Sequence, residues 1–341
     1  MTSARQIPEL HPSALGQMAA RLRDLSDAYA AGGPTPEQDA AWNAPYGPRE
    51  EWDLDVRDDS APGPHGPVPV RVYSPRTPSA APRPVLVFCH GGSFQHGDLD
   101  MPEADATARG VAGRADAVVV SVDYRLCDEP LGGNPARRLP GTPEDLEVRA
   151  PIPCDDVIAA VDWTRAQAGE LGIDPARLAL GGASAGGNLA AAASLRLAEE
   201  GCAPALSLLM YPVTHPLNPE PTAEEAEALG ALPEPLGFSP EKMRVMSENY
   251  LGGPLEDATA HDFPGLGTRE QLAILPRTYL EADEHDHLRL SARRYAEQLA
   301  EAGVEVEYVV RRGVTHGHLN KVGLAEAAQS FEKLAALVGE L

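Results

Sequence analysis

The chain has 341 residues, of which 43% are hydrophobic, and this length allows one large domain with a full core or two smaller ones. Its formal net charge of −23 disfavours nucleic acid and anionic membranes as partners, because so acidic a chain would repel both. No apolar run approaches the roughly 20 residues of a membrane span, and the start of the chain lacks the apolar core of a secretory signal, so we expect a cytoplasmic protein.

The predicted elements begin with an amphipathic helix over residues 12–31, followed by a segment rich in proline and glycine. Apolar residues recur in this helix at the spacing of one helical face, namely Leu15, Met18, Leu22, Leu25 and Tyr29. Eight short strands are then expected, at 50–59, 68–75, 84–90, 117–125, 177–182, 205–212, 277–283 and 304–313. Helical stretches separate the later strands, at 104–115, 156–171, 185–201 and 291–303.

The alternation of strands and helices indicates an α/β fold with a mostly parallel central sheet and helices on both faces. In such sheets, functional residues collect at the carboxyl ends of the strands. Two segments interrupt the alternation. Residues 126–153 are rich in proline, glycine and charge, and residues 213–265 contain an acidic stretch and one helical patch at 240–251. Long inserts of this kind are usually lids, binding loops or mobile segments.

A candidate nucleophile, Ser184, lies at the centre of Gly182-Ala183-Ser184-Ala185-Gly186, between a predicted strand and a predicted helix. The motif is weak by itself, but this context is the one that a nucleophile elbow requires. The glycines leave room for neighbouring backbone, and the dipole of the following helix favours negative charge near the serine. The alternative is a glycine-rich turn that contains an idle serine.

A serine nucleophile needs a base and an acid that orients the base. His316 and His318 follow the last predicted strand, and Asp283, Glu284 and Asp286 lie at or just after the end of the strand before it. The chain order of serine, acid and histidine is the one expected for this architecture. Spacing alone leaves open which acid and which histidine take part.

Candidate oxyanion donors lie in a turn after the strand at 84–90, His90-Gly91-Gly92-Ser93. Small residues there can expose backbone N–H groups to a substrate oxygen, and the N–H of Ala185 can supply another. Taken alone, the turn could be an ordinary tight turn. That alternative loses weight because the other parts follow in the correct order.

Together these motifs resemble the hormone-sensitive lipase-like branch (family IV) of the α/β-hydrolase esterases, from about residue 68 to the C-terminus. The family's H-G-G-G, D-Y-R-L, G-D-S-A-G-G-N, D-P-L-R and H-G-F motifs correspond to residues 90–93, 123–126, 182–188, 286–289 and 316–318. The resemblance implies Ser184 as nucleophile, Asp286 as acid and His316 as base. It also implies an oxyanion hole in which Gly91 permits the turn and the donors are the N–H groups of Gly92, Ser93 and Ala185.

The resemblance further implies an α/β-hydrolase core formed by residues 51–212 and 266–341. A discontinuous helical cap would be formed by residues 1–50 and 213–265. The loop at 127–152 is longer than the family pattern predicts and is expected near the site. Candidate residues for the substrate pocket are His96, Tyr124 and His318. For His96, an ordinary polar loop residue is an equal alternative.

Four residues depart from the family's motifs. Ser93 replaces a glycine, Ala183 replaces the aspartate beside the nucleophile, and His287 and His318 replace a proline and a phenylalanine. Ser93 still has a backbone N–H, so the oxyanion hole can survive this change. We expect other contacts to orient the elbow in place of the missing carboxylate.

The leading hypothesis is a serine-dependent carboxylic ester hydrolase that acts on a small to medium ester through an acyl-enzyme. It needs no cofactor and no metal, and the four widely spaced cysteines are expected to be reduced thiols. One alternative uses the same triad on a specialised biosynthetic substrate, by lactone or amide hydrolysis, acyl transfer or elimination. Another is a binding protein like the plant gibberellin receptor, which resembles this family but lacks the catalytic histidine. The sequence leaves a homodimer open.

Overall fold

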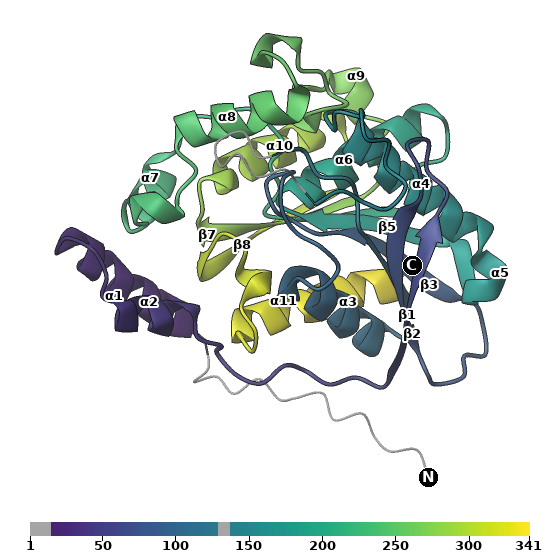
Figure 1. The fold of residues 1–341 in the computed structure, drawn as a ribbon, viewed down its shortest axis with the longest axis horizontal. Helices are drawn as coiled ribbons and strands as arrows, with labels where there is room; N and C mark the ends of the chain where they lie inside the picture. The colour runs from purple at the N-terminus through teal and green to yellow at the C-terminus, as the bar shows by residue number, and fades with distance from the viewer. Residues whose placement is uncertain (1–14, 129–136) are drawn as a thin grey trace.

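The computed structural model describes residues 15–128 and 137–341, arranged around one eight-stranded sheet (Figure 1). The start of the predicted N-terminal helix and part of the loop at 127–152 lie outside the described residues. The strand order is β1-β2-β4-β3-β5-β6-β7-β8. Strand β2 runs antiparallel to both of its neighbours, β1 and β4, and all other neighbouring strands are parallel. All eight predicted strands are confirmed, as Leu54–Ala61, Val68–Pro75, Arg83–Cys89, Val118–Val122, Ile173–Ala183, Leu206–Met210, Thr278–His285 and Val306–Thr315.

Helices cover both faces of the sheet, as the sequence predicts. The helices are α3, α4, α5, α6, α10 and α11, which span Pro102–Ala115, Ile152–Ala166, Ala168–Leu171, Ala185–Glu199, Leu288–Ala302 and Ala325–Gly339. Side chains of α4, α6 and α10 share one core cluster, and those of α3 and α11 share the other. In β3, Val85 and Val87 belong to the first cluster and Leu86 and Phe88 to the second. The strand is apolar throughout because its side chains alternate between two buried faces.

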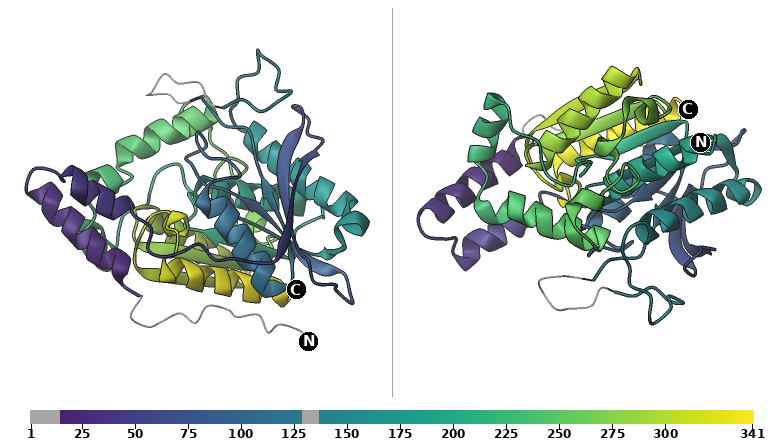
Figure 2. Two further views of the ribbon diagram at one scale, coloured as in Figure 1. Left: turned by 60° about the horizontal axis from the view of Figure 1, so that its bottom comes forward. Right: turned by 90° about the horizontal axis from the view of Figure 1, so that it is seen from above.

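Two further helical regions lie together on one side of the molecule (Figures 1 and 2). The first comprises α1 and α2, Gln17–Ala30 and Pro36–Asn43. The second is the chain between β6 and β7, where α7 and α8 span Ala223–Gly230 and Pro240–Leu251. The same stretch contains shorter helices, with η2 (Glu234–Leu236) between α7 and α8. The others come after α8, at Leu255–Asp257 (η3), Pro264–Leu266 (η4) and Arg269–Leu272 (α9). None of the helices in the described part of the chain is long and apolar enough to cross a membrane.

Four α-helices of the described residues are absent from the sequence prediction: α2, α7, α9 and α11. Both α2 and α7 are short helices of eight residues that begin with a capping box, in which Thr35 pairs with Gln38 and Thr222 with Glu225. These reciprocal side-chain bonds satisfy N–H groups that a helix start would leave unpaired. These capping boxes therefore stabilise short helices in segments whose proline-rich or acidic composition resembles that of a loop.

Candidate active site

Ser184 occupies the sharp turn between β5 and α6. Its backbone angles, φ 55° and ψ −118°, are costly for any residue other than glycine. The Ser184 N–H donates to the Met210 carbonyl at 2.9 Å, which fixes the turn to the neighbouring strand β6. The side chain is thereby presented at the carboxyl edge of the sheet.

The glycines on either side of Ser184 confirm the predicted steric role. A Cβ atom on Gly182 would lie 2.2 Å from the Gly186 carbonyl oxygen. A Cβ atom on Gly186 would lie 2.2 Å from the His90 carbonyl oxygen. Contacts this short do not occur between real atoms, so the turn closes only with glycine at both positions.

Three of the predicted site residues form one hydrogen-bonded chain. The Ser184 Oγ lies 3.0 Å from His316 Nε2, and His316 Nδ1 lies 2.7 Å from Asp286 Oδ2. Asp286 is fully buried, and its other oxygen accepts the Leu288 N–H at 2.9 Å. Since an ionised carboxylate only accepts, His316 carries its proton on Nδ1 and offers Nε2 to the serine hydroxyl.

Two opposing effects act on the pKa of His316. Burial would lower it by disfavouring the imidazolium, whereas the charge of Asp286 and the hydrogen bond to it favour that form. The net effect raises the pKa of His316 above its ordinary value. A base with a raised pKa takes a serine proton more readily, provided that the pH keeps it neutral.

The candidate oxyanion turn lies directly beside the nucleophile. Gly92 and Ser93 both have positive φ, 121° and 55°, so the backbone reverses sharply there. The Gly91 N–H donates to the Glu103 carboxylate at 2.5 Å, which leaves this residue to shape the turn. Within residues 15–128 and 137–341, the N–H groups of Gly92, Ser93 and Ala185 donate to no protein acceptor. These three N–H groups remain free for a ligand oxygen.

The prediction that Tyr124 lines the substrate pocket is wrong. Its side chain is fully buried, its hydroxyl donates to the His90 carbonyl at 2.7 Å, and its ring stacks on the His90 ring at 4.5 Å. Tyr124 therefore supports the oxyanion turn from the protein interior and does not line a pocket.

His318, the second pocket candidate, is also fully buried, so the prediction that it lines the substrate pocket is wrong. Gly317, with φ 75°, turns the chain inward into a short helix, η5 (His318–Asn320), which takes the imidazole under the site. His318 Nδ1 lies 2.7 Å from Asp283 Oδ1, and Nε2 lies 2.9 Å from the Ser330 hydroxyl. The Asp283 contact has the distance of an ion pair but not the angle of a hydrogen bond. Asp283 therefore pairs with His318, whereas Asp286 pairs with His316.

The third candidate, His96, lies exposed on the loop that carries the oxyanion turn, and its role in the pocket stays a prediction. The structure also brings in residues that the sequence analysis did not name. The ring of Phe238, between η2 and α8, meets the His316 ring edge-on at 4.8 Å, and Tyr211 meets it at 5.1 Å. No motif marks Phe238, because its contact depends on how the insertion folds back over the sheet.

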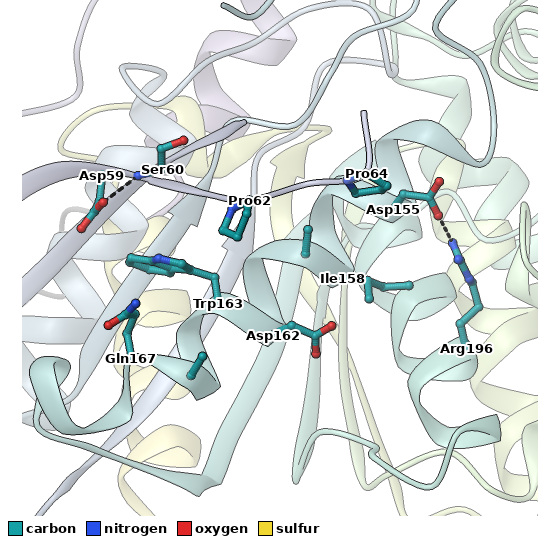
Figure 3. A pocket seen from close by; sticks show the side chains of 12 residues that line it. Asp59, Ser60, Pro62, Pro64, Asp155, Ile158, Asp162, Trp163, Gln167 and Arg196 are labelled. Carbon is teal, nitrogen blue, oxygen red and sulfur yellow. Dashed lines mark hydrogen bonds and ion pairs between the residues drawn. The ribbon is translucent and has the colours of Figure 1, made fainter. Parts of the chain in front are cut away.

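A hollow of about 830 Å³ beside α4 is separate from the triad (Figure 3). It is lined by side chains from β1 and α4, among them Asp59 and Trp163, and by the ion pair of Asp155 with Arg196 at 2.8 Å. In the described residues, no group of three or more histidine, cysteine or acidic side chains is placed to hold a metal ion.

Comparison with known proteins identifies the family of this chain and several similar esterases. Residues 86–320 match the family model Abhydrolase_3, described as an alpha/beta hydrolase fold. The chain belongs to this family. It is 36% identical over 280 residues to the esterase LipI of Mycobacterium tuberculosis, covering 81% of this chain and 78% of LipI. The carboxylesterase NlhH of the same organism is 34% identical over 269 residues, 76% of this chain and 74% of that protein.

Solved structures show the same fold. EstE1, a thermophilic carboxylesterase cloned from a metagenomic library, superposes with a TM-score of 0.71 at 28% sequence identity. The match covers 95% of this chain and 95% of EstE1. The α/β-hydrolase fold and the hormone-sensitive lipase-like branch inferred from the motifs are thus confirmed.

Proposed function

We propose that this α/β hydrolase is a serine-dependent carboxylic ester hydrolase that works through an acyl-enzyme. Hydrolysis of ester bonds is the activity in the names of its relatives, which include an esterase and a carboxylesterase. The observation that carries the proposal is the hydrogen-bonded chain from Asp286 through His316 to Ser184.

The proposed reaction follows from the positions of the protons. His316 Nε2 takes the proton of the Ser184 hydroxyl as the oxygen attacks the ester carbonyl, and Asp286 stabilises the resulting imidazolium. The N–H groups of Gly92, Ser93 and Ala185 stabilise the oxyanion of the tetrahedral intermediate. His316 then gives its proton to the departing alcohol, and water, activated by the same base, releases the acid from Ser184.

Substrate size is proposed from the residues above the triad. Phe238 covers one edge of His316, and Ser184 is only 5% exposed. The insertion at 213–265, together with α1 and α2, would act as a cap that limits the acyl and alcohol groups. We therefore favour small to medium esters, with a small-molecule substrate as the only required partner.

Covalent labelling combined with turnover tests this proposal. A fluorophosphonate probe should attach to the peptide that contains Ser184, as mass spectrometry would show, and short-chain p-nitrophenyl esters should be hydrolysed. Labelling without hydrolysis of any ester in a graded series would favour the specialised-substrate alternative. Absence of both labelling and hydrolysis in the folded protein would refute the proposal.

The pH dependence of the reaction should reflect the raised pKa of His316. Only the neutral imidazole accepts the serine proton, so kcat/KM should be full above the pKa and fall as the pH drops through it. Because the pKa is raised, the midpoint of this acid limb should lie above that of a free histidine, about 6.5. A pH-stat titration of ester hydrolysis measures it, and a midpoint below that of free histidine would contradict the assignment.

A further inference from the structure

The strongest unassigned feature near the triad is the buried carboxylate of Glu103, in the first turn of α3. Only 1% of the residue is exposed, and three donors from three separate loops converge on its two oxygens. Oε2 accepts the Gly91 N–H at 2.5 Å, and Oε1 accepts the Tyr211 hydroxyl at 2.7 Å. Oε1 also lies 3.2 Å from the Asn320 side-chain amide, whose oxygen accepts the Glu103 N–H at 3.1 Å.

Each of these donors belongs to a segment that shapes the catalytic site. Gly91 begins the oxyanion turn, and Tyr211 follows β6 and packs edge-on against His316 at 5.1 Å. Asn320 lies in η5, a few residues after His316. A single carboxylate thus joins the turn that holds the oxyanion donors to the two segments that hold the catalytic base.

The carboxylate also lies beside the nucleophile elbow. A Cβ atom added to Gly91 would lie 2.7 Å from Glu103 Oε2, 3.1 Å from Ser184 Cβ and 3.2 Å from the Ala183 carbonyl oxygen. Glu103 Oε2 and the elbow therefore both border the space beside the Gly91 α-carbon. Ala183 itself is fully buried and belongs to an apolar cluster, so it contributes no polar contact there.

We infer that Glu103 is a positioning residue of the active site. It fixes the positions of the oxyanion turn and the His316 loop relative to Ser184, and it does not touch the substrate. This inference rests on the proposed function, because it assigns Glu103 a role in the same triad chemistry.

The local contacts suit a carboxylate at this position. All three groups that meet the Glu103 oxygens are donors, and the two oxygens of a carboxylate side chain accept hydrogen bonds. Its place in the first turn of α3 lets the helix dipole stabilise the negative charge. Removing the carboxylate would leave the Gly91 N–H and the Tyr211 hydroxyl buried without an acceptor, and the oxyanion turn would be free to shift.

Glu103→Ala should lower kcat by about 10²-fold, since the effect is comparable to the loss of one oxyanion-hole donor. KM should change little, because the oxyanion contacts strengthen in the transition state and contribute little to ground-state binding. Glu103→Gln keeps one acceptor oxygen and should lose about tenfold, between the alanine variant and the wild type. Steady-state kinetics on one short-chain ester measures both effects.

Asp105 provides a matched control, because it is a buried carboxylate on the same helix. It accepts from the Tyr73 hydroxyl at 3.0 Å and pairs with Arg109 at 2.9 Å, away from the site loops. Asp105→Asn should disturb the stability of α3 but leave kcat unchanged. An equal loss of kcat in Asp105→Asn and Glu103→Ala would show that a damaged α3 explains both, and would overturn the inference.

A second readout separates a positioning role from a general loss of structure. The charges of Asp286, Asp283 and Glu103 each favour the imidazolium form of His316 and raise its pKa. Glu103→Gln removes one of these charges, so the acid limb of kcat/KM should move to lower pH. An acid limb in its wild-type place, together with a wild-type kcat, would overturn the inference.

Labelling of the wild type separates a failure of this inference from a failure of the proposed function. The rate of fluorophosphonate labelling at Ser184 provides a measurement that does not require turnover, and it should fall in Glu103→Ala as kcat does. If the wild type labels and the folded Glu103→Ala protein labels equally fast, the inference about Glu103 fails while the proposed function stands. If the wild type neither labels nor hydrolyses esters, the proposed function fails and the inference fails with it.

Discussion

Ser184→Ala is expected to reduce kcat for ester hydrolysis by a factor of about 10⁶, which leaves only the residual effect of substrate binding and the oxyanion hole. Alanine keeps the Cβ atom and removes only the oxygen that attacks the carbonyl. Because the residue is 5% exposed and lies between glycines that fix the turn, the elbow should keep its shape. Initial rates on a p-nitrophenyl ester, with thermal unfolding to verify the fold, measure the effect.

A matched serine control is available in the same region. Ser330 lies 2.9 Å from His318 Nε2, and His318 Nδ1 lies 2.7 Å from Asp283, which resembles the arrangement of the triad. All three residues are almost fully buried, so no substrate reaches them. Ser330→Ala should therefore retain activity while losing some stability. Retention of most of the wild-type rate by Ser184→Ala would refute its role as nucleophile.

The sheet could be predicted from the sequence because burial on two faces leaves a simple signal. Strand β3 reads as a nearly continuous apolar run, since Leu86 and Phe88 face one core cluster and Val85 and Val87 face the other. The strand ends then placed the candidate serine, acid and histidine at one edge. Periodicity and chain order brought these candidates together, but the choice of Asp286 and His316 among them came from the resemblance to the family.

The orientation of individual side chains at the site could not be predicted in the same way. His318 follows His316 by two residues, yet the positive φ of Gly317 turns it into the interior. Tyr124 likewise follows a strand end, but its hydroxyl reaches back to the oxyanion turn. A motif gives the position of a residue in the chain, whereas tertiary packing decides which way its side chain points.

Glu103 escaped prediction for a related reason. It lies in the first turn of α3, where an acidic residue is common for helix stability alone. Its partners Gly91, Tyr211 and Asn320 are spread over 230 residues of the chain, so no local pattern connects them. The alanine at position 183 predicted only that other contacts orient the elbow, and it pointed to no particular residue.

The choice between the two buried aspartates near His316 leads to a sharp expectation. Asp286→Asn should lower kcat by about 10⁴-fold, because an amide can donate to Nδ1 and thereby favour the wrong tautomer of His316. Asparagine keeps the shape of the side chain, so the loss would come from the proton position and from the missing charge that stabilises the imidazolium. Measuring kcat well above the acid limb separates this effect from a simple pKa shift.

Asp283→Asn is the matched comparison, because this residue is as buried as Asp286 and lies three positions earlier. Its partner is His318 at 2.7 Å, so the change should mainly lower the free energy of unfolding and affect kcat far less. Thermal unfolding and kinetics on both variants would compare the two roles directly. If Asp283→Asn lost as much kcat as Asp286→Asn while remaining folded, the acid of the triad would have to be reassigned. The reverse order of losses would identify Asp283 as the orienting acid and reduce the 2.7 Å contact between Asp286 and His316 to a structural one.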